Sequence, residues 1–205
     1  MTWLGPAAAP GGRTCQASIR SKVERSMNGP ELSLGAAASK PFRWLVDGCF
    51  TELQLTTRWH EQRRTYPPAV SMLIDRAWRE AQRAAHAAGQ ELFAGPLCRL
   101  LAWHTHGDAL VLDLGPTDYR EFVGTNLRHP ELAGEFGREV LANPLGVSIA
   151  VVTHDQHLVL QCRSGSVFEN PGMLHVCGGN LDPQDVGQGG PFATARREVT
   201  EELSV

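Results

Sequence analysis

Three glutamates at the end of the sequence, Glu198, Glu201 and Glu202, have a spacing that can bind a metal ion. In a helix, residues at positions i, i+3 and i+4 share one side, so the three carboxylates would lie together. Their repulsion costs an isolated helix roughly 0.2–0.5 kcal/mol per pair. Mg²⁺ removes this cost, because its preferred ligands are carboxylates, water and substrate phosphate oxygens. The spacing therefore predicts a Mg²⁺-binding helix that takes part in phosphate chemistry.

Apolar residues of the same segment indicate how this helix is held. Val199 and Leu203 point away from the glutamates and lie in line with Phe192, which gives the helix an apolar side. Pro191 suits the first position of a helix. Arg197 stands four residues before Glu201 and can pair with it, which would orient that carboxylate.

A pair of glycines precedes the helix. The sequence predicts a strand over residues 173–177 that runs into Gly178 and Gly179, followed by a loop over residues 180–190. Glycine has no Cβ atom, so backbone N–H groups at Gly178 and Gly179 can approach a metal ion or a phosphate closely.

Further elements are expected upstream from hydrophobic periodicity and turn residues. Apolar residues recur at helical spacing over residues 69–88, and Gly89 is a natural helix end. Residues 115–118 are expected to form a turn that caps the next helix. The remaining expected elements are strands at 42–46 and 51–55, a hairpin of 97–104 and 109–114, helices at 119–123 and 130–141, and a hairpin of 146–152 and 157–163.

The composition restricts the class of protein. The 205 residues are 42% hydrophobic with a formal net charge of −3, and no basic stripe is interleaved with aromatic residues, which argues against a nucleic-acid partner. No apolar run reaches the roughly 18–20 residues that a membrane span needs. The five cysteines lack paired spacing, so we expect reduced thiols and a cytoplasmic protein. Residues 1–40 are expected to form a disordered extension, with an acid-poor organelle transit peptide as the alternative.

The order hairpin, strand, Gly-Gly, loop and acidic helix resembles the Nudix hydrolases. The second half of their sequence motif is matched by Arg197, Glu198, Val199, Glu201, Glu202 and Val205, while Ser204 replaces a glycine. The first half of the motif departs from the family. No glutamate lies between Gly179 and Arg197, where Asp182 and Asp185 are the acidic residues present.

A second resemblance, which covers about residues 71–205, is to the Nudix-type UDP-glucose/UDP-galactose hydrolases. It is carried by the block from Asp113 to Asn126, with shorter matches at 93–96, 143–147, 158–160, 163–164 and 171–174. This resemblance implies that water cleaves the pyrophosphate of a nucleotide sugar, giving UMP and a sugar 1-phosphate. The implied cofactor is Mg²⁺, with Mn²⁺ as the alternative. The preferred sugar and the oligomeric state stay open.

The resemblance and the chemistry together assign expected roles to individual residues. The expected metal ligands are Glu198, Glu201 and Glu202, and the expected catalytic residues are Glu198, Glu201 and Arg197. Whether Glu198 is a third ligand or the base that takes the proton of water stays open. The expected substrate-binding residues are Tyr119, Asn126, Arg163, Gly178 and Gly179, of which Tyr119 and Asn126 rest on the family resemblance.

The expected fold class is α/β, with a Nudix-type α/β/α sandwich preceded by a small α+β domain. The boundaries are a disordered extension at 1–40, an N-terminal α+β domain at 41–143 and a partial Nudix domain at 144–205. The Nudix fold is expected to be incomplete at its C-terminal end, because further elements usually follow the acidic helix. Two alternatives stay open: a pyrophosphatase for coenzyme A or ADP-ribose, and a weak or inactive Nudix-like binding protein.

Overall fold

The computed structural model describes residues 45–163 and 172–203. Contacts between Cα atoms divide the chain into one unit at residues 1–48 and another at 49–205, and the second unit holds nearly all of the described residues. The predicted extension over residues 1–40 and most of the predicted strand at 42–46 lie outside the described residues. Among those that are described, no helix is long and apolar enough to span a membrane.

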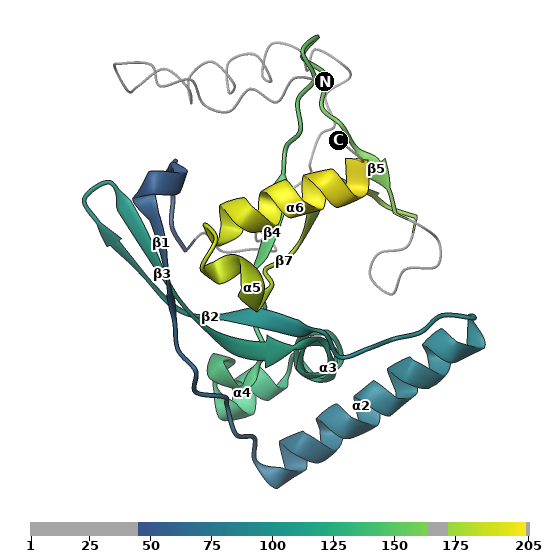
Figure 1. Cartoon of the computed structure of the whole chain (residues 1–205). Helices are drawn as coiled ribbons and strands as arrows, with labels where there is room; N and C mark the ends of the chain where they lie inside the picture. Colours follow the sequence, from purple (N-terminus) through teal and green to yellow (C-terminus); the bar gives the residue numbers. More distant parts are fainter. Residues whose placement is uncertain (1–44, 164–171, 204–205) are drawn as a thin grey trace, which may run out of the picture. The chain divides into compact units, whose positions relative to one another are not determined.

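A three-stranded sheet forms the first part of the second unit (Figure 1). Its strands are β1 (Leu55–Trp59), β2 (Pro96–His106) and β3 (Ala109–Asp118), in the order β1-β3-β2. β2 and β3 are antiparallel, which confirms the predicted hairpin, and β1 runs parallel to β3. The alternating leucines of β3, Leu110, Leu112 and Leu114, are buried, as the period-2 pattern predicts.

Two predictions near this sheet are wrong. The predicted strand at 51–55 is out of place, because β1 begins only at Leu55. The residues before it form η1 (Glu52–Gln54), a 3₁₀ turn in which the Gln54 side chain accepts a hydrogen bond from the backbone N–H of Thr51 at 3.0 Å. Residues 115–118 are not a turn but the end of β3, where they pair with the start of β2. The expected cap is confirmed, because the Asp118 side chain accepts a hydrogen bond from the backbone of Glu121.

Helix α2 (Pro68–Ala87) confirms the predicted helix at 69–88. Its buried residues are Val70, Ile74, Ala77, Trp78 and Ala81, which recur at helical spacing. The Trp78 ring meets the Tyr119 ring edge-on, with 6.4 Å between the centroids. Helix α2 thus covers the short helices that follow β3 and fixes the ring of Tyr119.

The segment after β3 contains α3 (Tyr119–Phe122), the π-helical turn η2 (Val123–Leu127), α4 (Leu132–Phe136) and the 3₁₀ turn η3 (Arg138–Val140). The predicted helix at 119–123 is confirmed, although the helical path continues through Gly124. The predicted helix at 130–141 is broken at Gly137. This residue has φ +82°, a left-handed conformation that ends α4 and that glycine adopts readily.

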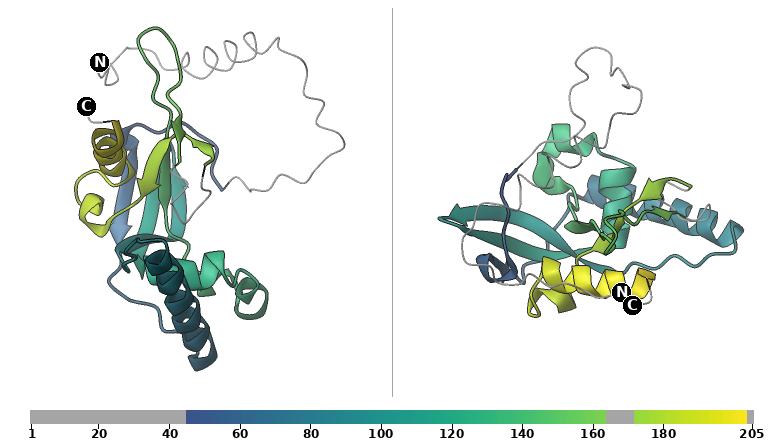
Figure 2. Two further views of the ribbon diagram at one scale, coloured as in Figure 1. Left: turned by 90° about the vertical axis from the view of Figure 1, so that its right-hand side faces the viewer. Right: turned by 90° about the horizontal axis from the view of Figure 1, so that it is seen from above.

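The C-terminal elements are β4 (Gly146–Ile149), β5 (Gln161–Cys162), β6 (Leu174–His175), β7 (Cys177–Asn180), α5 (Pro183–Val186) and α6 (Pro191–Leu203). A bridge between Val152 and Leu158 confirms the predicted hairpin, although its strands pair mainly elsewhere: β4 with β7 and β5 with β6. The predicted loop at 180–190 contains α5. Helix α6 begins at Pro191, as predicted, and lies along β7 and β4 (Figures 1 and 2).

Backbone hydrogen bonds join the C-terminal strands to β2. Cys98 in β2 donates to the carbonyl of Leu181 at 2.9 Å and accepts from Leu145 at 2.8 Å. Leu181 in turn donates to Leu145 at 2.8 Å. The residues on both sides of the predicted boundary at 143/144 therefore lie in one compact unit, and the boundary itself stays a prediction. The described chain is a mixed α/β structure, as expected.

Candidate active site

The acidic side of α6 faces the two glycines of β7. Glu198 is 13% exposed, and its carboxylate lies against Gly179. Glu202 accepts a hydrogen bond from the backbone N–H of Gly178 at 3.2 Å. Glu201 lies farther out and is 59% exposed. The structure therefore brings together the predicted glycines and two of the three predicted glutamates, while the third faces solvent beside them.

Gly178 and Gly179 must be glycines, because neighbouring atoms lie where the Cβ atom of any other residue would be. A Cβ atom on Gly178 would overlap the backbone carbonyl oxygen of Val147 in the adjacent strand β4. A Cβ atom on Gly179 would occupy the position of the Glu198 carboxylate. The Gly-Gly pair thus allows β4, β7 and α6 to pack together and leaves room for a carboxylate directly above the strand.

Replacing Gly178 by alanine is expected to destabilise the chain by about 2 kcal/mol or more, because backbone atoms of two paired strands would have to move apart. The matched control is Gly134→Ala in α4, where an added Cβ would meet no atom within 4 Å. That control should leave stability unchanged or raise it slightly. Urea unfolding of both variants measures the difference, and equal stabilities would contradict the close packing at Gly178.

Arg197 is held by a buried aspartate that follows the Gly-Gly strand. Its guanidinium donates two hydrogen bonds to Asp185, from Nη2 at 3.0 Å and from Nε at 3.3 Å. The Asp185 side chain is 7% exposed and also accepts from the Thr194 hydroxyl at 2.9 Å. Nη1 of Arg197 reaches Glu198 at 2.9 Å and Glu201 at 3.4 Å, the latter being the pair that the i, i+4 spacing predicts.

Asp185 is the residue of this site to which the sequence assigned no role. The sequence did contain a clue to such a role, because Asp185 is one of only two acidic residues between Gly179 and Arg197. What the sequence did not show was α5, which turns the Asp185 side chain toward α6. In this chain an aspartate therefore supplies the buried anion that fixes Arg197.

The carboxylates of Glu198 and Glu202 have pKa values shifted in opposite directions. Burial raises the pKa of Glu198, against the lowering effect of Arg197, and the charges of Glu201 and Glu202 raise it further. Burial alone would also raise the pKa of Glu202. Hydrogen bonds from Cys177, Gln161 and the Gly178 backbone outweigh burial and lower it. The site thus holds one carboxylate that resists ionisation beside one that is stabilised as an anion.

The raised pKa of Glu198 predicts a pH-dependent stability difference between the wild type and Glu198→Gln. A carboxyl whose pKa is higher in the folded state than in the unfolded state stabilises the fold at low pH, and this contribution is lost as the pH rises through the folded-state pKa. The wild type should therefore lose stability relative to Glu198→Gln as the pH increases above about 4.5. Urea unfolding in a chelator, over a pH series, measures this difference. A difference that is independent of pH would contradict the shift.

A cavity of about 250 Å³ is lined by residues of α6 together with Tyr119, the first residue of α3. Its lining comes from the turn before β2, from α3 and from the elements around α6: Phe93, Gly95, Pro96, Leu97, Tyr119, Asn180, Asp182, Arg197 and Glu198. The backbone N–H of Tyr119 donates to the carbonyl of Gly95 at 2.9 Å, which ties the turn to α3. Tyr119, predicted to bind substrate, and Arg197 and Glu198, predicted to be catalytic, therefore share one cavity.

Two other predicted substrate-binding residues lie elsewhere. The Asn126 side chain accepts a hydrogen bond from the Asn143 backbone at 3.0 Å and donates to the Asn143 side chain at 3.3 Å. Through these hydrogen bonds Asn126 joins η2 to the residue just before the C-terminal strands, and it does not line the cavity. Arg163 follows β5, where its backbone pairs with Met173 and Gly172. It borders residues 164–171, which lie outside the described residues.

No group of three or more His, Cys, Asp or Glu side chains within residues 45–163 and 172–203 is arranged to hold a metal ion. The glutamates of α6 instead accept hydrogen bonds from protein donors. Glu198 and Glu201 accept from Arg197, and Glu202 accepts from Gly178 and Gln161. A cation at this face would therefore have to exchange some of these hydrogen bonds for coordination.

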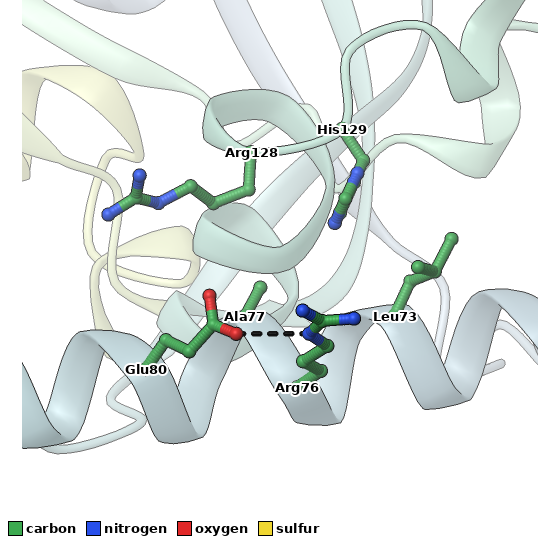
Figure 3. A pocket seen from close by; sticks show the side chains of 6 residues that line it. All are labelled: Leu73, Arg76, Ala77, Glu80, Arg128 and His129. Atoms are coloured by element: carbon green, nitrogen blue, oxygen red, sulfur yellow. Dashed lines mark hydrogen bonds and ion pairs between the residues drawn. The ribbon is translucent and has the colours of Figure 1, made fainter.

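A second cavity, of about 300 Å³, lies between α2 and the end of η2 (Figure 3). It is lined by Leu73, Arg76, Ala77, Glu80, Arg128 and His129. Arg76 and Glu80 form an ion pair at 3.0 Å across one helical turn of α2. None of the predicted site residues lines this cavity, so the first cavity is the candidate active site.

Comparison with known proteins supports the family resemblance. No family model matches the chain. The chain is 44% identical over 90 residues to the uridine diphosphate glucose pyrophosphatase NUDT22 of Mus musculus. The matched stretch covers 40% of this chain and 29% of that protein. The proteins of the same name from Homo sapiens and Bos taurus are 42% and 44% identical over 95 and 87 residues, covering 42% and 38% of this chain.

The chain spans about 30% of the length of the curated relatives that it matches. The matched stretch is nevertheless similar at a level that confirms the resemblance predicted from the sequence. Over the matched stretch, this chain is thus similar to three mammalian proteins named as UDP-glucose pyrophosphatases, as the resemblance in its sequence predicts.

Proposed function

We propose that the chain contributes the catalytic helix and part of the substrate pocket of a Mg²⁺-dependent nucleotide-sugar pyrophosphatase. In this reaction water attacks one phosphorus of UDP-glucose, the bond from that phosphorus to the bridging oxygen breaks, and UMP and glucose 1-phosphate form. The substrate class comes from the names of the mammalian relatives. UDP-galactose is the second candidate substrate, and the protein is proposed to act in the cytoplasm.

The observation that carries the proposal is the shared cavity. Its lining includes an aromatic side chain, Tyr119, and a charged pair, Arg197 and Glu198. A nucleotide sugar has matching parts, because it joins a flat base to a dianionic diphosphate. Base stacking on an aromatic ring and phosphate binding near an arginine are the interactions expected for these parts. Asn180 and Asp182, also in the cavity lining, offer hydrogen bonds to hydroxyl groups.

The donors at α6 fit a Mg²⁺ ion by their chemistry. Three carboxylates from one helix lie at or beside the Gly-Gly strand, and the absence of a Cβ atom at Gly179 makes room for the Glu198 carboxylate. We propose Glu201 and Glu202, with Glu198 as a third candidate, as the residues that would hold the ion. When bound, Mg²⁺ would neutralise charge on the phosphate oxygens and help to orient the attacking water.

Glu198 is the proposed general base. It lines the cavity, and burial raises its pKa, which moves this carboxyl toward the range in which proton transfer is efficient at neutral pH. Arg197 is the proposed positioning residue, because it donates to Glu198 and Glu201 while Asp185 anchors it. The phosphate contacts proposed for Gly178 and Arg163 follow from the family resemblance.

Phosphorus NMR with UDP-glucose, ADP-ribose and coenzyme A tests the proposal directly. With Mg²⁺ present, the signals of UDP-glucose should be replaced by those of UMP and glucose 1-phosphate, faster than the other two substrates are cleaved. Preferential cleavage of ADP-ribose or coenzyme A would contradict the substrate assignment. Saturable binding of UDP-glucose without cleavage would support the second candidate, a non-catalytic nucleotide-sugar binding protein. That candidate is favoured by the carboxylates being paired with protein donors.

A further inference from the structure

The three glutamates of α6 are held by different kinds of hydrogen-bond donor. Glu198 and Glu201 accept from the guanidinium of Arg197, at 2.9 Å and 3.4 Å. Glu202, one helical turn beyond Glu198, accepts instead from two neutral amides, the side chain of Gln161 and the backbone N–H of Gly178. Gln161 is not among the site residues predicted from the sequence, and the fold brings it to this carboxylate.

Gln161 reaches Glu202 from a separate pair of strands. It lies in β5, directly opposite His175 of β6, whereas Gly178 lies in β7, which pairs with β4. In Figure 1, β5 lies beside the end of α6 that carries Glu202. The two amides thus approach one carboxylate from two different sheets, and together they fix the direction of the Glu202 side chain.

The charge of the donors determines what else each carboxylate can bind. A guanidinium neutralises its partner, so a metal ion at Glu198 or Glu201 competes with Arg197 for the same negative charge. An amide carries no charge and leaves that of Glu202 available to a cation. Both amides donate to the same oxygen, Oε2, so these two hydrogen bonds do not occupy Oε1. The thiol of Cys177 is a third donor to this carboxylate, but a weak one that a metal ion can displace.

We propose that Gln161 is a positioning residue of the metal site, whose side-chain amide holds Oε2 of Glu202 and leaves Oε1 to Mg²⁺. This inference rests on the proposed function, in which Glu202 is one of the residues that would hold the ion. Hydrogen-bond partners of this kind orient metal-binding carboxylates, and their removal typically lowers metal affinity about 10- to 100-fold. Gln161 acts through Glu202 and contacts neither the ion nor the substrate.

Electron paramagnetic resonance of Mn²⁺ measures this role without catalysis, because the sharp signal of the free ion is lost when the ion binds. Gln161→Met keeps the length of the side chain and removes the amide donor. At pH 8, where histidine side chains are ordinarily uncharged, the dissociation constant for Mn²⁺ should rise about 10- to 100-fold in this variant. The control Gln82→Met makes the same change on the exposed side of α2 and should bind Mn²⁺ like the wild type.

A double-mutant cycle distinguishes positioning from a general structural role. If Gln161 acts through Glu202, Gln161→Met should lower the Mn²⁺ affinity no further in a Glu202→Gln background. An unchanged affinity in Gln161→Met, or an equal loss in both backgrounds, would overturn the proposal. A wild type that binds no Mn²⁺ would overturn the metal site of the proposed function as well.

Nuclear magnetic resonance of the wild type gives a second measurement that does not depend on the folding of Gln161→Met. The side-chain amide signals of Gln161 should shift when Mg²⁺ is added, because the ion and the amide share the carboxylate of Glu202. The shift should be absent in Glu202→Gln. Amide signals that do not respond to Mg²⁺ in a wild type that binds the ion would contradict the role of Gln161.

Discussion

Replacing Glu198 by glutamine is expected to lower the rate of UDP-glucose hydrolysis by about 10²- to 10⁴-fold, the usual contribution of a general base. Glutamine preserves the size of the side chain that lies against Gly179, while it removes the carboxylate that would take the proton from water. The raised pKa of Glu198 makes the same substitution harmless to stability at neutral pH. Steady-state release of UMP measures the effect.

The control for this prediction is Glu135→Gln on the exposed side of α4, which changes the same chemical group away from the cavity. Glu135→Gln should retain wild-type activity. If Glu198→Gln also retained it, the base would have to be sought elsewhere, with Glu201 and Glu202 as the next candidates. Loss of activity together with loss of folding would be recognised by circular dichroism, and the preserved side-chain size argues against that outcome.

Replacing Asp185 by alanine is expected to have the largest effect on stability, about 2–4 kcal/mol, because the Arg197 guanidinium and the buried Thr194 hydroxyl lose the acceptor that they share. Arg197 would lose two hydrogen bonds and Thr194 one. Urea unfolding should show the loss. Asp155→Ala, in the exposed turn of the 146–163 hairpin, is the control and should remain near the wild type.

The same substitution should reduce hydrolysis even under conditions where the variant is folded. Arg197 is the donor that Glu198 and Glu201 share, so a displaced guanidinium would leave both carboxylates without their fixed partner. Loss of such a positioning contact typically costs about 10- to 100-fold in activity or metal affinity. Asp185→Asn keeps an acceptor for Thr194 and should lie between the wild type and Asp185→Ala. Equal activity in all three would contradict the anchoring role.

The elements that were predictable from the sequence are those with a long, regular hydrophobic period. Helix α2 and the β2–β3 hairpin carry such a period along most of their length, so the pattern can be read whichever neighbours they pack against. The errors concern segments whose structure depends on distant partners or on one residue. Residues 115–118 extend β3 because β2 pairs with them, and Gly137 interrupts a segment that otherwise favours a helix.

The candidate site, too, was predictable from local patterns but not from contacts with distant residues. The helical spacing of Glu198, Glu201 and Glu202 and the preceding glycines could be read from the sequence, because these residues lie in β7 and α6, which are close together in the chain. The role of Asp185 could not, since it depends on the direction in which α5 turns. The proximity of Tyr119 to α6 depends on hydrogen bonds between β2 and Leu181, which no local pattern reveals. Asn126, in contrast, was expected to bind substrate, but its side-chain amide accepts a hydrogen bond from the backbone of Asn143 instead.

Whether α6 holds a metal ion beside a bound nucleotide sugar can be measured by anomalous diffraction from crystals soaked with Mn²⁺ and a UDP-glucose analogue in which a methylene group replaces the bridging oxygen. We expect a manganese peak beside Glu201 and Glu202, with the diphosphate next to it and the nucleotide in the cavity lined by Tyr119 and Arg197. Manganese or nucleotide bound away from this cavity, with the α6 carboxylates still paired to Arg197 and Gly178, would contradict this expectation.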